Sequence, residues 1–134
     1  MPETKKIILD TNFLLIPAQF GLDIFTELQK TCSFSYNLYI IDKSLSELDN
    51  IIRQQRGAPK KAAQMTQKLL KNFINNNKIN IIPAKTGYID REILDISDKD
   101  TLVATQDAGL RKKLREKGVK TIIMRQRKYL QIEG

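Results

Sequence analysis

The sequence predicts a single three-layer α/β/α domain, in which helices cover both faces of a mainly parallel central β-sheet. Three observations lead to this fold class. Short apolar segments rich in β-branched residues alternate with amphipathic helical segments almost throughout the chain. The short segments are apolar along their length, which is typical of parallel strands buried on both faces. The length of 134 residues suits one domain, so residues 1–134 are expected to fold as a unit.

The N-terminal half begins with a strand that ends on Asp10, followed by an apolar run from Phe13 that starts the next helix. Further along, apolar residues at three- and four-residue steps predict helices, two of which are separated by Gly57 and Pro59. The expected elements of this half are strands at 7–9 and 36–41 and helices at 21–31, 43–55 and 59–76.

The C-terminal half continues the alternation. Pro83 ends its first strand, and Gly118 is the expected C-cap of a basic helix. The expected elements are strands at 79–82, 101–105 and 119–124, helices at 89–97 and 107–117, and a last edge strand at 128–132.

Composition narrows the classes of function. There are 23 Lys and Arg residues against 15 Asp and Glu, a formal charge of +8, which favours a polyanionic partner, nucleic acid before membrane. A merely soluble basic protein is the alternative.

No apolar stretch of about 18 residues is present and the N-terminus lacks the apolar core of a signal peptide, so a cytoplasmic protein without a membrane partner is expected. Without histidine, Ser-His-Asp and Cys-His catalysis are excluded, and Cys32 alone gives no internal disulfide or structural zinc site.

Four acidic residues lie near predicted turns from strand to helix: Asp10, Glu47, Asp90 and Asp107. In open α/β sheets, ligands bind beyond the carboxyl ends of the strands, where such turns lie. Carboxylates gathered there repel one another unless cations bind, and Mg²⁺ or Mn²⁺ are the hard ions that prefer oxygen ligands. Such ions hold a phosphodiester and lower the pKa of a bound water.

Each acid taken singly also fits a helix N-terminus. Ser44-x-x-Glu47 has the pattern of a capping box, and Asp90 and Asp107 suit an N-cap or a first helical turn. Glu92, one turn from the predicted site, is a candidate supporting ligand. Spacing alone leaves the metal site and the helix caps as equal alternatives.

Four short motifs follow one another over nearly the whole chain: Ile-Ile-Leu-Asp10-Thr-Asn, Leu45-Ser-Glu47-Leu48, Asp90-x-x-Ile93 and Ala104-Thr105-x-Asp107-x-x-Leu110. Their order resembles that of the PIN-domain nucleases. A further segment, Arg125-Gln126-Arg127-Lys128-Tyr129, resembles the archaeal and eukaryotic branch that includes the pre-rRNA cleavage nucleases of small-subunit maturation.

The resemblance implies a metal-dependent endoribonuclease whose catalytic acids and Mg²⁺ or Mn²⁺ ligands are Asp10, Glu47, Asp90 and Asp107. Thr105 matches the hydroxyl residue two before the last acid, and Thr11 or Asn12 is expected to hold a ligand in place. Two positions depart from the pattern. Arg91 stands where close relatives often have a second acid, so it either weakens metal binding or contacts phosphate, and Gln106 replaces a frequent Asn.

RNA is expected to lie along basic side chains that bind phosphates without reading sequence. Tyr88 or Tyr129 is a candidate for stacking on an unpaired base. The predicted RNA-binding residues are Arg91, Arg111, Lys112, Arg115, Arg125, Arg127 and Lys128. The branch resemblance implies processing of an rRNA precursor, with a homodimer and a ribosome-assembly partner. A toxin-type RNase of a toxin–antitoxin pair, a non-catalytic RNA-binding PIN scaffold and a DNA flap nuclease are the alternatives.

Overall fold

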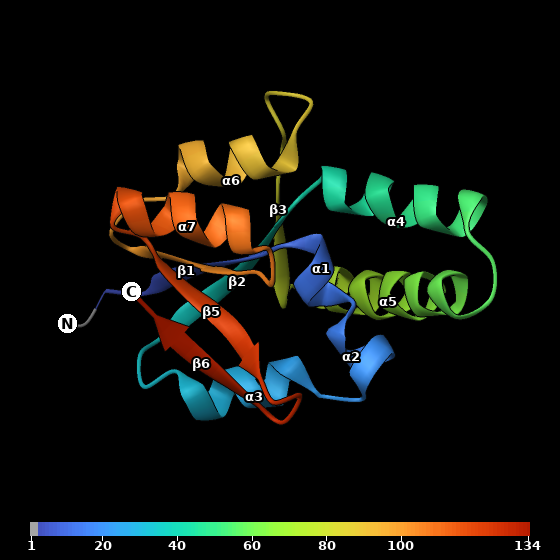
Figure 1. Cartoon of the computed structure of the whole chain (residues 1–134), viewed down its shortest axis with the longest axis horizontal. Helices are drawn as coiled ribbons and strands as arrows, with labels where there is room; N and C mark the ends of the chain where they lie inside the picture. Colours follow the sequence, from blue (N-terminus) through green and yellow to red (C-terminus); the bar gives the residue numbers. More distant parts are fainter. Residues whose placement is uncertain (1–2) are drawn as a thin grey trace.

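The computed structural model describes residues 3–134, and its centre is a six-stranded sheet in the order β3-β2-β1-β4-β5-β6 (Figure 1). Strands β1 to β5 pair in parallel, whereas β6 runs antiparallel to β5. The mainly parallel sheet confirms the predicted fold class. The strands are β1 (Lys5–Leu9), β2 (Tyr36–Ile41), β3 (Ile79–Ile82), β4 (Thr101–Ala104), β5 (Lys120–Arg125) and β6 (Tyr129–Glu133).

Helices pack on both faces of the sheet and form two separate apolar clusters. Side chains alternate along a strand, so Ile7 and Leu9 of β1 join one cluster while Ile8 joins the other. The first cluster receives helices α1 to α5, and the second receives α6 and α7. The helices are α1 (Thr11–Leu14), α2 (Ile16–Phe20), α3 (Ile24–Thr31), α4 (Lys43–Gln54), α5 (Ala58–Asn75), α6 (Ile89–Ile96) and α7 (Ala108–Lys117).

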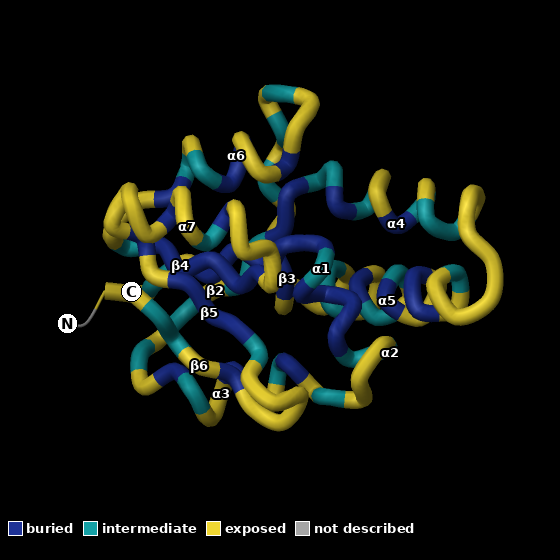
Figure 2. The backbone as a smooth tube through the Cα atoms, in the orientation of Figure 1, coloured by how far each residue is buried: buried dark blue, intermediate teal, exposed yellow. Residues whose placement is uncertain are grey.

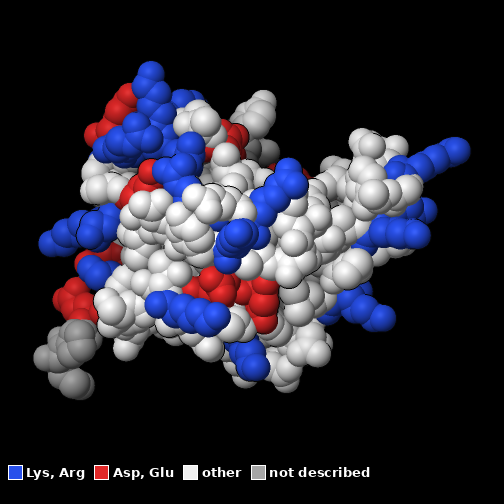
Figure 3. All heavy atoms as spheres, turned by 60° about the horizontal axis from the view of Figure 1, so that its bottom comes forward, with Lys and Arg blue, Asp and Glu red and all other residues white. Residues whose placement is uncertain are grey.

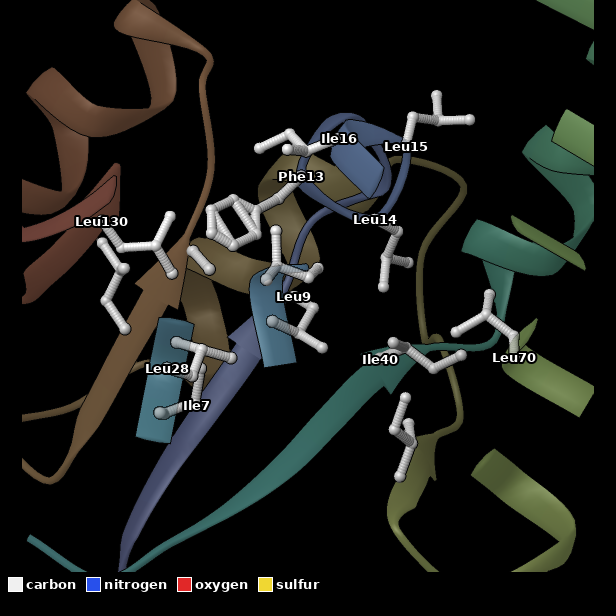
Figure 4. Packing of buried hydrophobic residues seen from close by; sticks show 14 of the residues in the cluster. Ile7, Leu9, Phe13, Leu14, Leu15, Ile16, Leu28, Ile40, Leu70 and Leu130 are labelled. Carbon is white, nitrogen blue, oxygen red and sulfur yellow. The ribbon is translucent and has the colours of Figure 1, made fainter. Parts of the chain in front are cut away.

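The segment directly after Asp10 is anchored in the larger cluster. Phe13 and Leu14 of α1 and Ile16 of α2 are almost completely buried and lie over the carboxyl end of β1 (Figure 4). Burying an aromatic or aliphatic side chain of this size contributes roughly 1.5–3 kcal/mol. Figure 2 shows the result, a buried path through β1 and α1 at the centre of the molecule. Asp10 is therefore held between two fixed elements.

The start of α3 differs from the predicted one because a side chain caps the backbone. The helix expected from residue 21 begins at Ile24, since the Asp23 carboxylate accepts hydrogen bonds from the N–H groups of Phe25 and Thr26. Gly21, with a φ of 70°, instead ends α2 in the left-handed conformation.

Positive charge is dispersed over the surface. Figure 3 shows lysine and arginine side chains mainly around the rim of the face drawn, with acidic side chains gathered near its middle. Among residues 3–134, none of the helices has both the length and the apolar character that a bilayer crossing requires.

Candidate active site

Asp10 is the most tightly held acid of the predicted set. It follows β1 directly and is only 5% exposed. Its Oδ1 accepts the Thr11 N–H at 2.9 Å, and its Oδ2 accepts the Thr105 hydroxyl at 2.7 Å and the Asn12 amide at 3.0 Å. The Asp10 N–H also donates to the carbonyl of Ala104 in the neighbouring β4. These contacts fix both carboxylate oxygens at the carboxyl edge of the sheet.

Thr105 links Asp10 to Asp107. Its hydroxyl donates to Asp10 and accepts the Asp107 N–H at 3.1 Å. Asp107 is the N-cap of α7, where its Oδ1 accepts the Leu110 N–H at 3.0 Å. The predicted cap is therefore confirmed, and the same residue faces the site. Asn12 joins this network because its side-chain oxygen accepts the Gln106 N–H at 3.0 Å.

Glu47 and Asp90 reach the same edge from α4 and α6, and both are exposed. Glu47 and Asp90 line one groove of about 360 Å³, while Asp90 and Asp107 line a second of about 630 Å³. Helix α6 begins at Ile89, one residue before Asp90, with Tyr88 as its N-cap. Asp90 thus belongs to the first turn of α6, and its carboxylate borders both grooves.

The electrostatics of the acids indicate that they converge. Burial raises the pKa of Asp10, outweighing the hydrogen bonds from Thr105 and Thr11, and the charges of Asp90 and Asp107 raise it further. Partial desolvation of its carboxyl group and the charges of Asp10 and Asp90 raise the pKa of Glu47. The pKa of Asp90 is also raised, by partial desolvation and then by the charge of Asp107.

The carboxylates are near neighbours rather than a closed set of ligands. Within residues 3–134, no three acidic, histidine or cysteine side chains lie close enough together to share one ion. Their chemistry still fits a hard divalent cation, because the donors are all carboxylate oxygens and three of them have raised pKa values. A bound cation relieves both the burial of negative charge and the mutual repulsion.

Two predicted supporting residues, Glu92 and Thr11, hold neighbouring parts of the chain in place around the site. Glu92 is buried and its carboxylate accepts the N–H groups of Lys85, at 2.6 Å, and Thr86. Although burial favours its neutral form, these hydrogen bonds and the Lys85 charge lower the pKa of Glu92. Thr11 donates its hydroxyl to Ser44 at 2.9 Å, both side chains being buried.

The capping box expected at Ser44 and Glu47 is wrong. Helix α4 begins at Lys43, so Ser44 lies inside the helix and its hydroxyl is used by Thr11. Asp42, at the N-cap position, makes no side-chain hydrogen bond to the helix. Its Oδ1 instead accepts the N–H of Ala84 at 3.0 Å, which fixes the segment that follows β3.

The predicted RNA-binding residues are divided between two regions. Arg91 lines the larger groove beside Asp90. Arg125 and Arg111 instead pair with Glu133, at 3.0 and 3.6 Å. The remaining members are exposed: Lys112, Arg115, Arg127 and Lys128.

The turn between β5 and β6 lies at the same edge of the sheet as Asp10, because β5 is parallel to β4. Arg127 in this turn lies over the ring of Phe20, with its guanidinium carbon 4.8 Å from the ring centroid.

Two lysines that sequence reasoning did not select also line the grooves. Lys43 lines the smaller groove and Lys113 the larger, where its charge partly offsets the raised pKa of Asp90. Gly109 and Lys113 are four residues apart in α7 and therefore share a helix face. The position of Lys113 on this face of α7 was the available signal in the sequence, but it becomes informative only once α6 is known to lie opposite.

Comparisons with known proteins agree with this architecture. The model of the family described as "PIN like domain" matches residues 7–127. Ribonuclease VapC4 of Methanocaldococcus jannaschii is 26% identical over 133 residues, covering 96% of this chain and 97% of that protein.

Two solved structures share the fold. One, described as the PIN domain endonuclease Utp24, has a TM-score of 0.75 and 22% identity, covering 96% of this chain and 90% of its own. The other is a domain of a functionally unknown protein from Methanocaldococcus jannaschii, with a TM-score of 0.61, 17% identity and coverages of 91% and 92%. Since the family match extends over most of the sequence, the chain belongs to the PIN-like domain family.

Proposed function

We propose that this protein is a metal-dependent endoribonuclease that hydrolyses RNA phosphodiester bonds at the grooves between α4, α6 and α7. The observation that carries the proposal is that four acids from separate parts of the chain, Asp10, Glu47, Asp90 and Asp107, meet at one edge of the sheet. Asp90 lines one groove with Glu47 and another with Asp107, and the Thr105 hydroxyl joins Asp10 to Asp107. The similarity to Ribonuclease VapC4 over nearly the whole of both chains also supports it.

In this proposal Asp10, Asp90 and Asp107 hold Mg²⁺ or Mn²⁺, and Glu47 is a further ligand or holds the attacking water. When bound, such an ion polarises the phosphate and lowers the pKa of water. The chain itself supplies an Asp10 carboxylate whose two oxygens are already oriented by three donors. That preorganisation limits the rearrangement that binding requires.

Basic side chains of the larger groove neutralise the RNA backbone. Arg91 and Lys113 flank Asp90 there, so a phosphate is attracted to the groove that the acids alone would repel. Arg91 is thus assigned to phosphate rather than to a defect in metal binding. Arg127 and Lys128 extend the positive edge on the other side of Asp10.

The test is cleavage of an unstructured RNA in Mn²⁺ by Asp10→Asn. This variant is expected to lose cleavage while keeping the wild-type circular dichroism spectrum. Glu116→Gln removes an exposed acid of α7 outside the grooves and is the matched control, expected to cleave normally. Undiminished cleavage by Asp10→Asn would refute the assignment. RNA binding by the wild type without any Mn²⁺-dependent cleavage would indicate a non-catalytic RNA-binding scaffold.

For the biological role we propose processing of an rRNA precursor in the cytoplasm, together with a ribosome-assembly partner. Its support is the resemblance of the segment at 125–129 to that of pre-rRNA cleavage nucleases. A toxin-type RNase is the second candidate, and a small antitoxin gene directly upstream of the coding sequence would favour it. Accumulation of uncleaved rRNA precursor in cells lacking the protein would favour the first role.

A further inference from the structure

Tyr88 is a large exposed side chain at the junction of the two grooves. It is 75% exposed, and it lines both the groove that contains Glu47 and the groove that contains Asp107. The loop that carries it, residues 83–88, projects between α4 and α6 (Figure 1). The ring belongs to neither apolar cluster, so its face is free to contact a molecule bound in the grooves.

The backbone beneath Tyr88 is fixed by buried and half-buried acceptors. Asp42 accepts the Ala84 N–H, and Glu92 accepts the next two N–H groups along the chain. The Thr86 hydroxyl lies 3.4 Å from both the N and the carbonyl O of Tyr88. The backbone that carries the ring is thus fixed before binding, so little backbone freedom is lost when a ligand stacks on the ring.

Cations lie on both sides of the ring. Lys43 lines the smaller groove, and Arg91 and Lys113 line the larger. The two groove volumes, about 360 and 630 Å³, fall in the range of small-ligand sites. Aromatic rings placed along a basic groove are typical of sites that bind single-stranded nucleic acid, where bases stack and the backbone follows the charges.

We propose that Tyr88 is a base-stacking platform that divides the active-site groove into two nucleotide subsites. One unpaired base stacks on the ring, the phosphate on one side is held by Lys43, and that on the other by Arg91 and Lys113. Bases inside a duplex do not expose their faces to a side chain, so this site selects unpaired RNA. The inference rests on the proposed ribonuclease function and names the residue that selects its substrate.

The first test is binding of a fluorescent, unstructured RNA octamer in EDTA at low salt, followed by anisotropy. Tyr88→Ala is expected to weaken binding roughly 5- to 150-fold, the range for loss of one stacked base. Tyr88→Phe keeps the ring and is expected to bind like the wild type. Met65→Ala removes another large exposed side chain, in α5, that lines neither groove and is the matched control. Wild-type binding by Tyr88→Ala would overturn the inference.

The second test moves a single abasic sugar along the same RNA. At one position, the abasic change should weaken binding to the wild type but have no further effect on Tyr88→Ala, because both remove the same contact. Additive effects at every position would contradict the platform. Because binding is measured without metal, the test is independent of the proposed chemistry. If the abasic change and Tyr88→Ala are coupled but the protein shows no Mn²⁺-dependent cleavage, the stacking platform is supported and the nuclease function is rejected. Normal cleavage without such coupling would reject the platform alone.

Discussion

At the scale of single residues, Asp10 combines two opposing influences. Burial and neighbouring carboxylates raise its pKa, while the hydroxyl of Thr105 and the backbone of Thr11 stabilise its ionised form. Thr105 is central because it also accepts the Asp107 N–H, so one hydroxyl orients two acids of the site. The polar network therefore acts on both the charge state and the position of Asp10.

Thr105→Val tests this role, since it keeps the shape of a fully buried side chain and removes the hydroxyl. Loss of the hydrogen bond raises the pKa of Asp10, so the acid limb of the pH–rate profile is expected to move to higher pH. The unpaired groups left behind are expected to lower the free energy of unfolding by about 1–3 kcal/mol. Thr105→Ser restores the hydroxyl and should restore the profile. An unchanged acid limb in Thr105→Val would show that Thr105 does not tune Asp10.

At the scale of elements, apolar periodicity in the sequence predicted the strands and helices because each buries a continuous face. The pattern at Ser44 and Glu47 was misleading for a tertiary reason: Thr11, 33 residues away in the chain, takes the Ser44 hydroxyl. Asp42 and Glu92 likewise bind the loop before α6, and no local signal distinguishes them from ligands. The resemblance selected the four acids as candidates, but the two grooves that Glu47, Asp90 and Asp107 line became visible only in the fold.

The turn between β5 and β6 contains a local conflict between sequence and backbone. Gln126 and Arg127 both have positive φ values, 54° and 55°, and the Lys128 N–H donates to the Arg125 carbonyl at 3.0 Å. Two successive positive φ values closed by such a hydrogen bond are typical of a type I′ turn, which favours Asn-Gly. Neither residue is of the types that tolerate the left-handed region well.

Replacing Gln126 with Gly is expected to raise the free energy of unfolding, by about 1 kcal/mol or less, because relief of the left-handed strain exceeds the added freedom of the unfolded chain. Gln126→Ala removes the same exposed side chain but keeps a β-carbon, so it should not stabilise. Urea unfolding of the two variants separates the backbone effect from the side-chain effect. Equal stabilities for the two variants would contradict strain at this position.

At the scale of the whole molecule, the site gathers negative charge in a protein that is otherwise positive, with a formal charge of +8. The pKa values of Asp10, Glu47 and Asp90 are all raised, so their ionised forms are less stable in the folded protein than in the unfolded chain. A site built in this way reduces the stability of the metal-free protein. That cost is expected where function rather than packing has fixed the residues.

The pH dependence of stability follows from these shifts. Between the ordinary carboxylate pKa, about 4, and the raised folded value, the folded state binds more protons, so its stability falls as pH rises. Acids with lowered pKa values, such as Asp23 and Asp98, make stability rise with pH instead. The contribution of a single raised acid is therefore measured as the difference between a variant that lacks it and the wild type. In EDTA, Asp90→Asn is expected to have a higher Tm than the wild type, by a margin that grows from pH 4 to 7. A lower Tm for Asp90→Asn at neutral pH would contradict the repulsion.

Addition of Mn²⁺ should reverse this order. A ligand that binds only the folded state stabilises it by about 2.7 kcal/mol at a concentration one hundred times its Kd. The wild type, which keeps the three proposed ligands Asp10, Asp90 and Asp107, is therefore expected to gain more in Tm from Mn²⁺ than Asp90→Asn gains. Differential scanning fluorimetry at pH 7 with increasing Mn²⁺ measures both proteins, and Glu116→Gln should follow the wild type. Equal gains in the wild type and Asp90→Asn would mean that the ion binds elsewhere. The repulsion among these carboxylates would then not be relieved by a bound cation.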